Sequence, residues 1–283
     1  MKKDNSSGGR DKMLPGRIGD LISGSRFEAK TSAFLTPSEQ RTVFENAVSE
    51  RASERCFFWG GAPEAERRIA VFVPKWMLTD NGIVGGAFDQ EREDELREII
   101  KSGSDSGIIS DAIVPIEIAG SSYSELSHRD YLGSIIGLGI ERDAIGDIVC
   151  SSASSAVAFL LPSAAKLVTS ELSTVGKEAV AVRIAELPVS FRIEHEYETI
   201  TETVMSPRLD GIVRALCKIS REEAAKLVSS GEVSVNYVTE DRTDYTVVKG
   251  DVISIRGYGK YIYDGDRGVN RRGRLRIDAR KYV

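Results

Sequence analysis

The chain has 283 residues, of which 41% are hydrophobic and 29% charged, and its formal net charge is −5. This composition is typical of a soluble globular protein with about two domains, or three small ones, and no apolar run approaches the roughly 20 residues of a membrane helix. The polar start, residues 1–17, lacks the apolar segment of a secretory signal. We therefore expect residues 1–30 to form a disordered tail of a cytoplasmic protein.

Cysteine and histidine are scarce in this chain. Cys56, Cys150 and Cys217 lie far apart, so they form neither a disulfide framework nor a Cys-x-x-Cys metal pair. His128 and His195 each lack a second His or Cys at ligand spacing. The sequence therefore predicts a reducing compartment, no bound metal and no other cofactor.

Residues 31–110 predict a small N-terminal α/β domain. Thr36, Pro37 and Glu39 stand in the order of an N-cap, a first helical residue and the far end of a capping box, so a helix begins here. Two short strands, a charged surface helix and a flexible loop follow, at residues 56–59, 68–74, 90–100 and 102–106.

Residues 111–190 predict a central domain of the ferredoxin-like or RNA-recognition-motif type. Its elements follow the order βαββαβ, at residues 112–118, 128–138, 147–150, 156–161, 163–173 and 179–184. The sheet of such a domain can stack bases on aromatic side chains, but only Phe159 lies in the third strand. Base stacking on this sheet is therefore not the mode of RNA binding that the sequence favours.

Residues 191–206 are rich in glutamate and threonine and predict a linker to a C-terminal domain at residues 207–283. That domain begins with two short helices. The first has one apolar stripe, formed by Leu209, Ile212, Val213 and Leu216. A capping box of Ser220 and Glu223 starts the second. Strands at residues 233–237 and 252–256 complete an ααβ arrangement that further strands follow.

Positive charge is concentrated in this C-terminal domain. Residues 208–283 hold 16 lysines and arginines against 11 aspartates and glutamates, whereas the rest of the chain holds 22 against 32. Segregated charge of this kind indicates a polyanionic partner such as RNA. A single lysine or arginine is more often only solvated, so it is the clustering that supports the prediction.

Several basic side chains are candidates for contact with RNA. The loop between the two helices and the start of the second helix bring basic groups to a common surface, where helix N–H groups also attract phosphate. Arg256, Tyr258 and Lys260 alternate with glycines, which predicts a strand that points all three to one face. The candidates from the residue pattern are Arg208, Arg214, Lys218, Ser220, Arg221, Lys226, Arg256, Tyr258, Lys260, Arg274 and Arg276.

The C-terminal domain resembles the S4 RNA-binding domain. The resemblance lies in residues 206–210, 219–224, 227–228, 231–236 and 249–255. The segment 256–260, the Arg-rich end and the upstream segments 34–40, 60–68 and 127–148 are similar to those of the YlmH-like family of S4 proteins. This resemblance covers about residues 30–283.

The resemblance implies a non-enzymatic protein that binds structured rRNA and tRNA on the large ribosomal subunit, in ribosome-associated quality control of stalled subunits. It implies an α+β fold, no small-molecule substrate and no cofactor, and we expect a monomer. It adds Asn236 to the RNA contacts. In the middle domain it points to His128, Arg129 and Arg142 as possible contacts.

Other functional hypotheses stay open. The triplet at residues 128–130 is similar to the kinase catalytic loop, but Ile135 stands where that loop needs asparagine. The triplet at 208–210 is similar to the aspartate motif of RNA pseudouridine synthases, so an RNA-modifying enzyme with an S4 handle is an alternative. A division-associated interaction protein, whose basic surface meets an acidic protein partner or a membrane, is a third.

Overall fold

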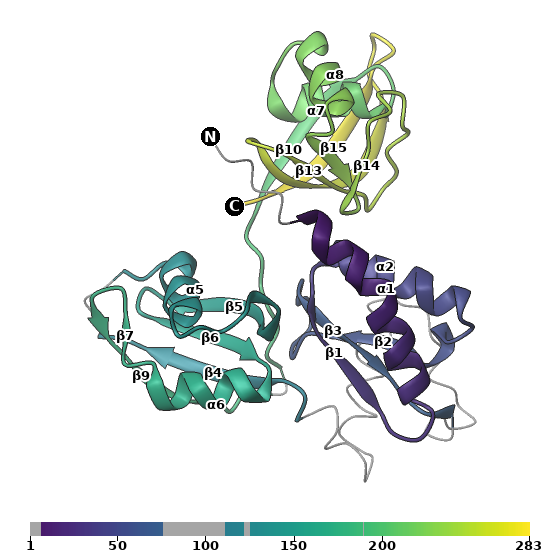
Figure 1. The fold of residues 1–283 in the computed structure, drawn as a ribbon. Coiled ribbons are helices and arrows are strands. Elements are labelled where there is room, and N and C mark those ends of the chain that lie inside the picture. The colour runs from purple at the N-terminus through teal and green to yellow at the C-terminus, as the bar shows by residue number, and fades with distance from the viewer. Residues whose placement is uncertain (1–6, 76–110, 122–124, 189) are drawn as a thin grey trace. The chain divides into compact units, whose positions relative to one another are not determined.

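The computed structural model describes residues 7–75, 111–121, 125–188 and 190–283 (Figure 1). Contacts divide the chain into two compact units, Met1–Ile193 and Glu194–Val283. The α+β fold class is confirmed. The helix expected at residues 90–100 and the loop expected at 102–106 lie outside the described residues.

An antiparallel three-stranded sheet forms the N-terminal part of the first unit. Its strands are β1 (Lys30–Leu35), β2 (Cys56–Trp59) and β3 (Arg68–Phe72), in the order β1-β3-β2. Helix α2 (Pro37–Ser49) begins at the predicted capping box, in which the Thr36 hydroxyl accepts the backbone N–H of Glu39. A short 3-10 helix, η1 (Ser53–Arg55), leads into β2.

Helix α1 (Ser7–Gly24) occupies most of the segment expected to be a disordered tail, so disorder does not extend over those residues. Ile18, Leu21 and Ile22 recur at helical spacing on this helix. The Ile18 side chain is buried in a cluster with Val43 and Phe72 of the neighbouring helix and sheet. The short apolar stripe follows a polar, glycine-containing stretch, and this concealed the helix in the sequence.

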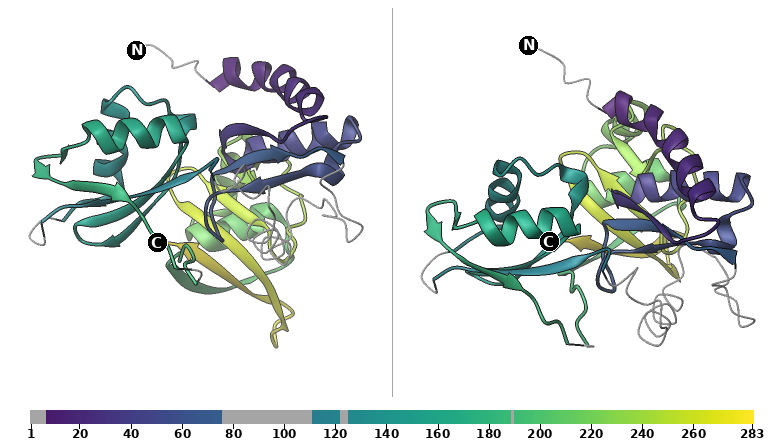
Figure 2. Two further views of the ribbon diagram at one scale, coloured as in Figure 1. Left: turned by 90° about the horizontal axis from the view of Figure 1, so that it is seen from below. Right: turned by 60° about the horizontal axis from the view of Figure 1, so that its bottom comes forward.

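The central part of the first unit has the predicted βαββαβ order. Its main elements are β4 (Val114–Ala119), α5 (His128–Gly137), β5 (Ile145–Ser152), β6 (Ser155–Leu160), α6 (Pro162–Glu171) and β9 (Ala181–Ile184). The strand order β5-β6-β4-β9 is that of a split βαβ domain, and both helices lie on one side of the sheet (Figure 2). A 3-10 helix η3 (Arg142–Ala144) precedes β5, and a small hairpin of β7 (Thr174–Val175) and β8 (Glu178–Ala179) precedes β9.

The other side of this central sheet is covered within the unit. Phe159 is fully buried in an apolar cluster with Phe34 and Ile69 from the N-terminal sheet. A Cβ atom added at Gly146 would lie only 2.6 Å from the ring of Phe34, so the close approach of the two parts requires glycine there. Stacking of bases on Phe159 is thereby prevented, in agreement with the interpretation of the sequence.

The C-terminal unit is a six-stranded antiparallel sheet with α7 (Leu209–Cys217) and α8 (Arg221–Ser229) packed on one face (Figure 1). The sheet order is β10-β15-β14-β13-β11-β12. The strands are β10 (Tyr197–Val204), β11 (Val233–Val235), β12 (Val238–Thr239), β13 (Val252–Ile255), β14 (Gly259–Val269) and β15 (Leu275–Tyr282). The predicted apolar stripe of the first helix lies in the core of this unit.

Strand β10 corrects the prediction of a linker at residues 191–206. It pairs along its whole length with β15, from Tyr197 opposite Tyr282 to Val204 opposite Leu275. Its β-branched residues suit a strand, and Glu198 lies opposite Lys281. The partner strand is nearly eighty residues away in the sequence, so local composition alone favoured a loop.

Candidate nucleic-acid interface

A buried carboxylate holds two of the predicted arginines together. Asp210 lies in the first turn of α7 and is 4% exposed. It accepts a hydrogen bond from Arg208 Nε at 3.2 Å and one from Arg221 Nη2, the first residue of α8, also at 3.2 Å. The two arginine side chains are 42% and 70% exposed, so each guanidinium group pairs with the buried carboxylate on one side and faces solvent on the other.

The protonation of Asp210 follows from these contacts. Burial by itself raises the pKa of the carboxyl group, but the hydrogen bonds and charges of Arg208 and Arg221 outweigh burial, so the pKa lies below its usual range. Asp210 is therefore ionised near neutral pH and keeps both guanidinium groups in place. This role of Asp210 was not predicted from the sequence. Residues 208–210 were noted there only for their similarity to the aspartate motif of RNA pseudouridine synthases.

The connection between the two helices carries further predicted contacts. Lys218 caps α7 in the left-handed region, with φ of 56°, and its side chain is exposed. Ser220 is the N-cap of α8: its hydroxyl accepts the N–H of Glu223, and the Glu223 carboxylate accepts the N–H of Ser220. The predicted capping box is confirmed, so this hydroxyl already has a structural partner. Arg214 is half-buried on α7 and Lys226 is exposed on α8.

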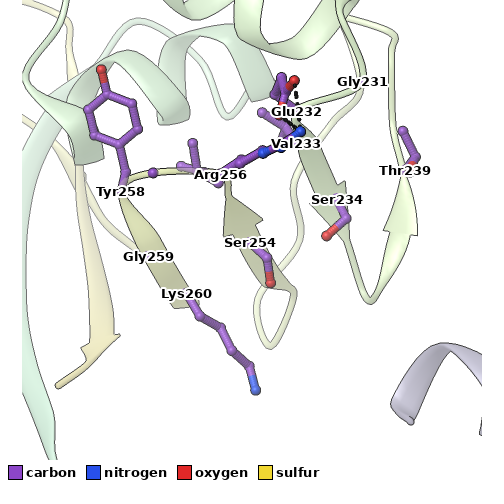
Figure 3. Close-up of a pocket in the computed structure, with 12 residues that line it drawn as sticks. Gly231, Glu232, Val233, Ser234, Thr239, Ser254, Arg256, Tyr258, Gly259 and Lys260 are labelled. Atoms are coloured by element: carbon purple, nitrogen blue, oxygen red, sulfur yellow. Dashed lines mark hydrogen bonds and ion pairs between the residues drawn. The ribbon is translucent and has the colours of Figure 1, made fainter. Parts of the chain in front are cut away.

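The segment 256–259 is a hairpin turn and not the strand that was predicted. Ile255 pairs with Gly259, Tyr258 N–H donates to the Ile255 carbonyl, and Gly257 and Gly259 have φ of 82° and 125°. Side chains in such a turn do not alternate as they do in a strand. Figure 3 shows that the side chains of Tyr258 and Lys260 point in opposite directions, so the prediction of a shared face is wrong.

This turn nevertheless borders a hollow that its basic residues share. An open depression of about 640 Å³ is lined by residues from β11, β12, β13, β14 and the turn, among them Arg256, Tyr258 and Lys260 (Figure 3). Arg256 donates to both carboxylate oxygens of Glu232, at 3.1 and 3.3 Å, while remaining 81% exposed. The hollow is therefore lined by two cationic residues, Arg256 and Lys260, and by three glycines, Gly231, Gly257 and Gly259, at which the backbone carries no side chain.

The remaining predicted contacts of the C-terminal unit lie in different surroundings. Asn236 has φ of 48°, and its side chain bonds both Asp251 and the backbone N–H of Val252, so it fixes the start of β13. Arg274 and Arg276 are exposed at and after the turn between β14 and β15. Asn236 thus has a clear structural role, whereas the two arginines project into solvent.

Of the candidates in the middle domain, two are exposed and one is part of the interior. His128 and Arg129 are exposed in the first turn of α5. Arg142 is half-buried and donates to the carbonyl of Ile145. Its pKa is lowered to about 10, first by burial and then by the neighbouring charge of Arg67. Arg142 therefore belongs to the interior of the first unit more than to its surface.

Asp147 completes that interior cluster and was not predicted. Its carboxylate accepts the backbone N–H of Glu66 at 2.6 Å and that of Arg67 at 3.2 Å. Burial raises the pKa of Asp147, although these two N–H donors act against the shift. The Arg67 side chain in turn donates to the carbonyls of Ile145 and Arg142. The cluster therefore joins the N-terminal and central sheets of this unit.

Asp130, the aspartate of the kinase-like triplet, has a structural partner. It accepts the N–H and the hydroxyl of Ser127 and so closes a capping box at the start of α5. These hydrogen bonds lower the pKa of Asp130. Within the described ranges, no group of three or more His, Cys, Asp or Glu side chains could hold a metal ion. Among the helices of the described residues, none is both long and apolar enough to cross a membrane.

Comparison with known proteins agrees with this domain order. Residues 112–190 match the family described as "Putative RNA-binding domain in YlmH", and residues 207–253 match the S4 domain family. The chain therefore carries a segment that matches the YlmH RNA-binding domain, followed by an S4 domain. The S4 match ends within β13, so β14, β15 and β10 of the same sheet lie outside the matched residues.

Two individual proteins are similar to this chain. It is 28% identical over 253 residues to "Ribosome-associated protein quality control protein P2" of Bacillus subtilis (strain 168), which covers 89% of this chain and 87% of that protein. The solved structure of "Cell division protein ylmH from Streptococcus pneumoniae" shares 18% identity and a TM-score of 0.43, over 66% of this chain and 96% of that chain.

Proposed function

We propose that the chain is a cytoplasmic, non-enzymatic factor that binds structured rRNA and tRNA on the large ribosomal subunit. In this proposal it acts as a monomer in ribosome-associated quality control of stalled subunits. The S4 domain and the similarity to a protein named for ribosome-associated quality control support the proposal. The C-terminal unit supplies the RNA contacts, and the first unit contributes orientation or protein contacts.

The observation that carries the proposal is the arginine pair at the helix starts. One buried carboxylate orients Arg208 and Arg221, whose guanidinium groups remain largely open to solvent. A planar guanidinium with several N–H donors suits phosphate, and pre-orientation lowers the entropic cost of the contact. Backbone N–H groups at the start of α8 also attract anions, and the carboxylates of Glu222 and Glu223 in the same turn act against this attraction.

The same observation weakens the alternative of a pseudouridine synthase. The aspartate of residues 208–210 would have to reach a substrate base, yet Asp210 is buried and bonded by two arginines. Its carboxylate therefore serves the arginines. The geometry favours binding over modification of RNA.

Salt dependence of ribosome binding tests the proposal. Co-sedimentation with purified large subunits should weaken steeply with salt, with a logarithmic slope of roughly −0.7 to −0.9 for each neutralised phosphate. Replacing Arg208 and Arg221 together by alanine should weaken binding and make the slope shallower by about one to two such increments. Lys166→Ala, which removes an exposed lysine from α6 in the other unit, is the matched control.

Two results would contradict the proposal. If binding to large subunits were equally strong at low and high salt, the proposal that contacts with phosphate supply the affinity would be refuted. An unchanged affinity and slope in the double variant, with its melting temperature retained, would remove the arginine pair from the interface. Mapping crosslinks to the bound RNA then distinguishes rRNA from tRNA contacts.

A further inference from the structure

The sheet of the C-terminal unit has a second face, opposite α7 and α8, with a distinctive row of side chains. The row crosses all six strands and consists of Thr239, Ser234, Ser254, Lys260, Tyr282 and Tyr197. Three hydroxyl groups stand at one end, an ammonium group in the middle and two aromatic rings at the other end. The row contains no carboxylate.

Strand register places these side chains together. Ser234 lies opposite both Thr239 and Ser254, and Ser254 lies opposite Lys260. The residues next in sequence, such as Val235, Ile253 and Tyr261, are buried in the core beneath the helices. Because successive side chains of a strand point to opposite faces, the row points away from that core. The hydroxyl half of the row lines the open hollow described above.

The aromatic half of the row is held in a compact arrangement of rings and cations. The rings of Tyr197 and Tyr282 meet edge to face with centroids 5.0 Å apart. The Lys260 ammonium lies 4.2 Å from the centroid of Tyr282 and 5.1 Å from that of Tyr237. Arg280, one row further along the sheet, lies 5.0 Å from the Tyr197 centroid and donates to both carboxylate oxygens of Asp264. Alternating rings and cations are therefore fixed side by side on this face.

We propose that this face binds an unpaired segment of RNA, separately from the arginine pair on α7 and α8. Every base has a π-face that can stack on a tyrosine ring. The lysine and arginine side chains attract the phosphates between the bases, and the hydroxyl groups can form hydrogen bonds with ribose and base edges. Six strands about 4.8 Å apart give the row a length of roughly 24 Å, enough for several unpaired nucleotides.

The cation over Tyr282 fits this use. A lysine stem is flexible, so the Lys260 ammonium moves to the adjoining phosphate when a base takes its place over the ring. A stacked base contributes more than an exposed cation–π contact, so the exchange favours the bound state. Three of the six strands of this face, β14, β15 and β10, lie outside the residues that match the S4 family. The aromatic end of the row is thus an addition to the S4 domain.

This inference rests on the proposed RNA binding by the C-terminal unit, and two RNA probes separate the two claims. A fluorescein-labelled single-stranded oligouridylate reports on the sheet face, and a labelled RNA hairpin reports on the helix face. Fluorescence polarisation of the full chain gives the Kd for each. Tyr282→Ala should weaken oligouridylate binding about tenfold, the effect of one stacked base, and leave the hairpin Kd within about twofold.

The controls distinguish stacking from folding. Tyr282→Phe keeps the ring and should bind oligouridylate as the unaltered protein does. Phe27→Ala removes an aromatic ring that is 84% exposed in the other unit and should change neither Kd. Should Tyr282→Ala lower the melting temperature strongly, crosslinking of the unaltered protein to 4-thiouridine RNA provides the test, with adducts expected on peptides that contain Lys260 or Tyr282.

The possible results of these experiments separate the sheet-face site from the proposed function. Oligouridylate affinity that is unchanged in Tyr282→Ala but lowered in the Arg208 and Arg221 double variant would overturn the sheet-face site and leave the proposed function standing. Adducts confined to α7 and α8 would do the same. Failure of the unaltered protein to bind either RNA would overturn the proposed function as well. Loss of subunit binding in Tyr282→Ala without loss of RNA affinity would assign this face to a protein partner and refute the inference.

Discussion

Replacement of Asp210 by asparagine tests the organisation of the arginine pair. Asparagine has nearly the same shape, and its carbonyl oxygen can still accept the N–H of Gly211, which lies 2.9 Å from the carboxylate. The substitution removes the negative charge that Arg208 and Arg221 share. Two neighbouring guanidinium groups then lack their common buried counter-charge.

The magnitude follows from the contacts. Hydrogen bonds to charged groups contribute about 1.5–3 kcal/mol each, but pairs with an exposed partner contribute about 1 kcal/mol or less. The arginine side chains are 42% and 70% exposed, so the smaller figure applies to both contacts. We expect Asp210→Asn to lower the free energy of unfolding by roughly 1–2 kcal/mol and the melting temperature of the C-terminal unit by roughly 5–15 °C.

Thermal unfolding followed by circular dichroism, at a series of pH values, measures the effect. The pKa of Asp210 is lowered in the folded protein, so its contribution is complete above its unfolded pKa of about 3.9 and is lost as the pH falls through the folded pKa. The difference between the unaltered protein and the variant should therefore be largest near neutral pH and should vanish in strong acid. Asp241→Asn, which changes an exposed carboxylate of the same unit, is the control.

Two results would refute this account of Asp210. An equal melting temperature for both proteins at neutral pH would show that the carboxylate does not stabilise the helix starts. A difference that persists unchanged below the folded pKa would show that shape, and not charge, carries the effect.

Three further substitutions test other parts of the structure. Ser220→Ala should lower the free energy of unfolding by about 0.5–2 kcal/mol through loss of the α8 cap, and should leave RNA affinity unchanged well below the melting temperature; weaker RNA binding at unchanged stability would restore Ser220 as a contact. Gly146→Ala should destabilise the first unit in urea by about 1–3 kcal/mol because its Cβ meets the Phe34 ring, whereas Gly133→Ala, with open space around it, should not. Asp147→Ala should cost about 1–3 kcal/mol for each backbone N–H left unpaired at residues 66 and 67, and a urea midpoint equal to that of the unaltered protein would exclude this role.

Local signals in the sequence predicted the elements that depend on neighbouring residues. The helix starts at Thr36 and Ser220 are confirmed because a capping box is complete within four residues. The βαββαβ order of the central part is also confirmed. Strand β10 was missed since its stability comes from pairing with β15, and α1 was missed since its short apolar stripe follows a polar segment.

The turn at residues 256–259 shows a different limit of sequence patterns. An alternation of long side chains with glycine fits both a strand and a turn, because glycine permits extended and left-handed backbone alike. The positive φ of Gly257 and Gly259 decides for the turn. For Asn236 the resemblance to S4 domains predicted an RNA contact. In the structure its side chain forms hydrogen bonds with Asp251 and with the backbone N–H of Val252, at the start of β13.

The carboxylates that pair with the predicted arginines decide what the basic end can bind. Sequence counting treats Asp210 and Glu232 as charges that cancel Arg208, Arg221 and Arg256. In the structure the Asp210 side chain is 6% exposed and that of Glu232 33%, while the three arginine side chains are 42%, 70% and 81% exposed. A partly buried acid beneath an exposed arginine orients the guanidinium and leaves its outer donors for a ligand. The ion pairs of this unit therefore lower its net positive charge but hold its arginine side chains in an orientation that suits phosphate. RNA affinity should depend on the orientation of the arginines as much as on their number.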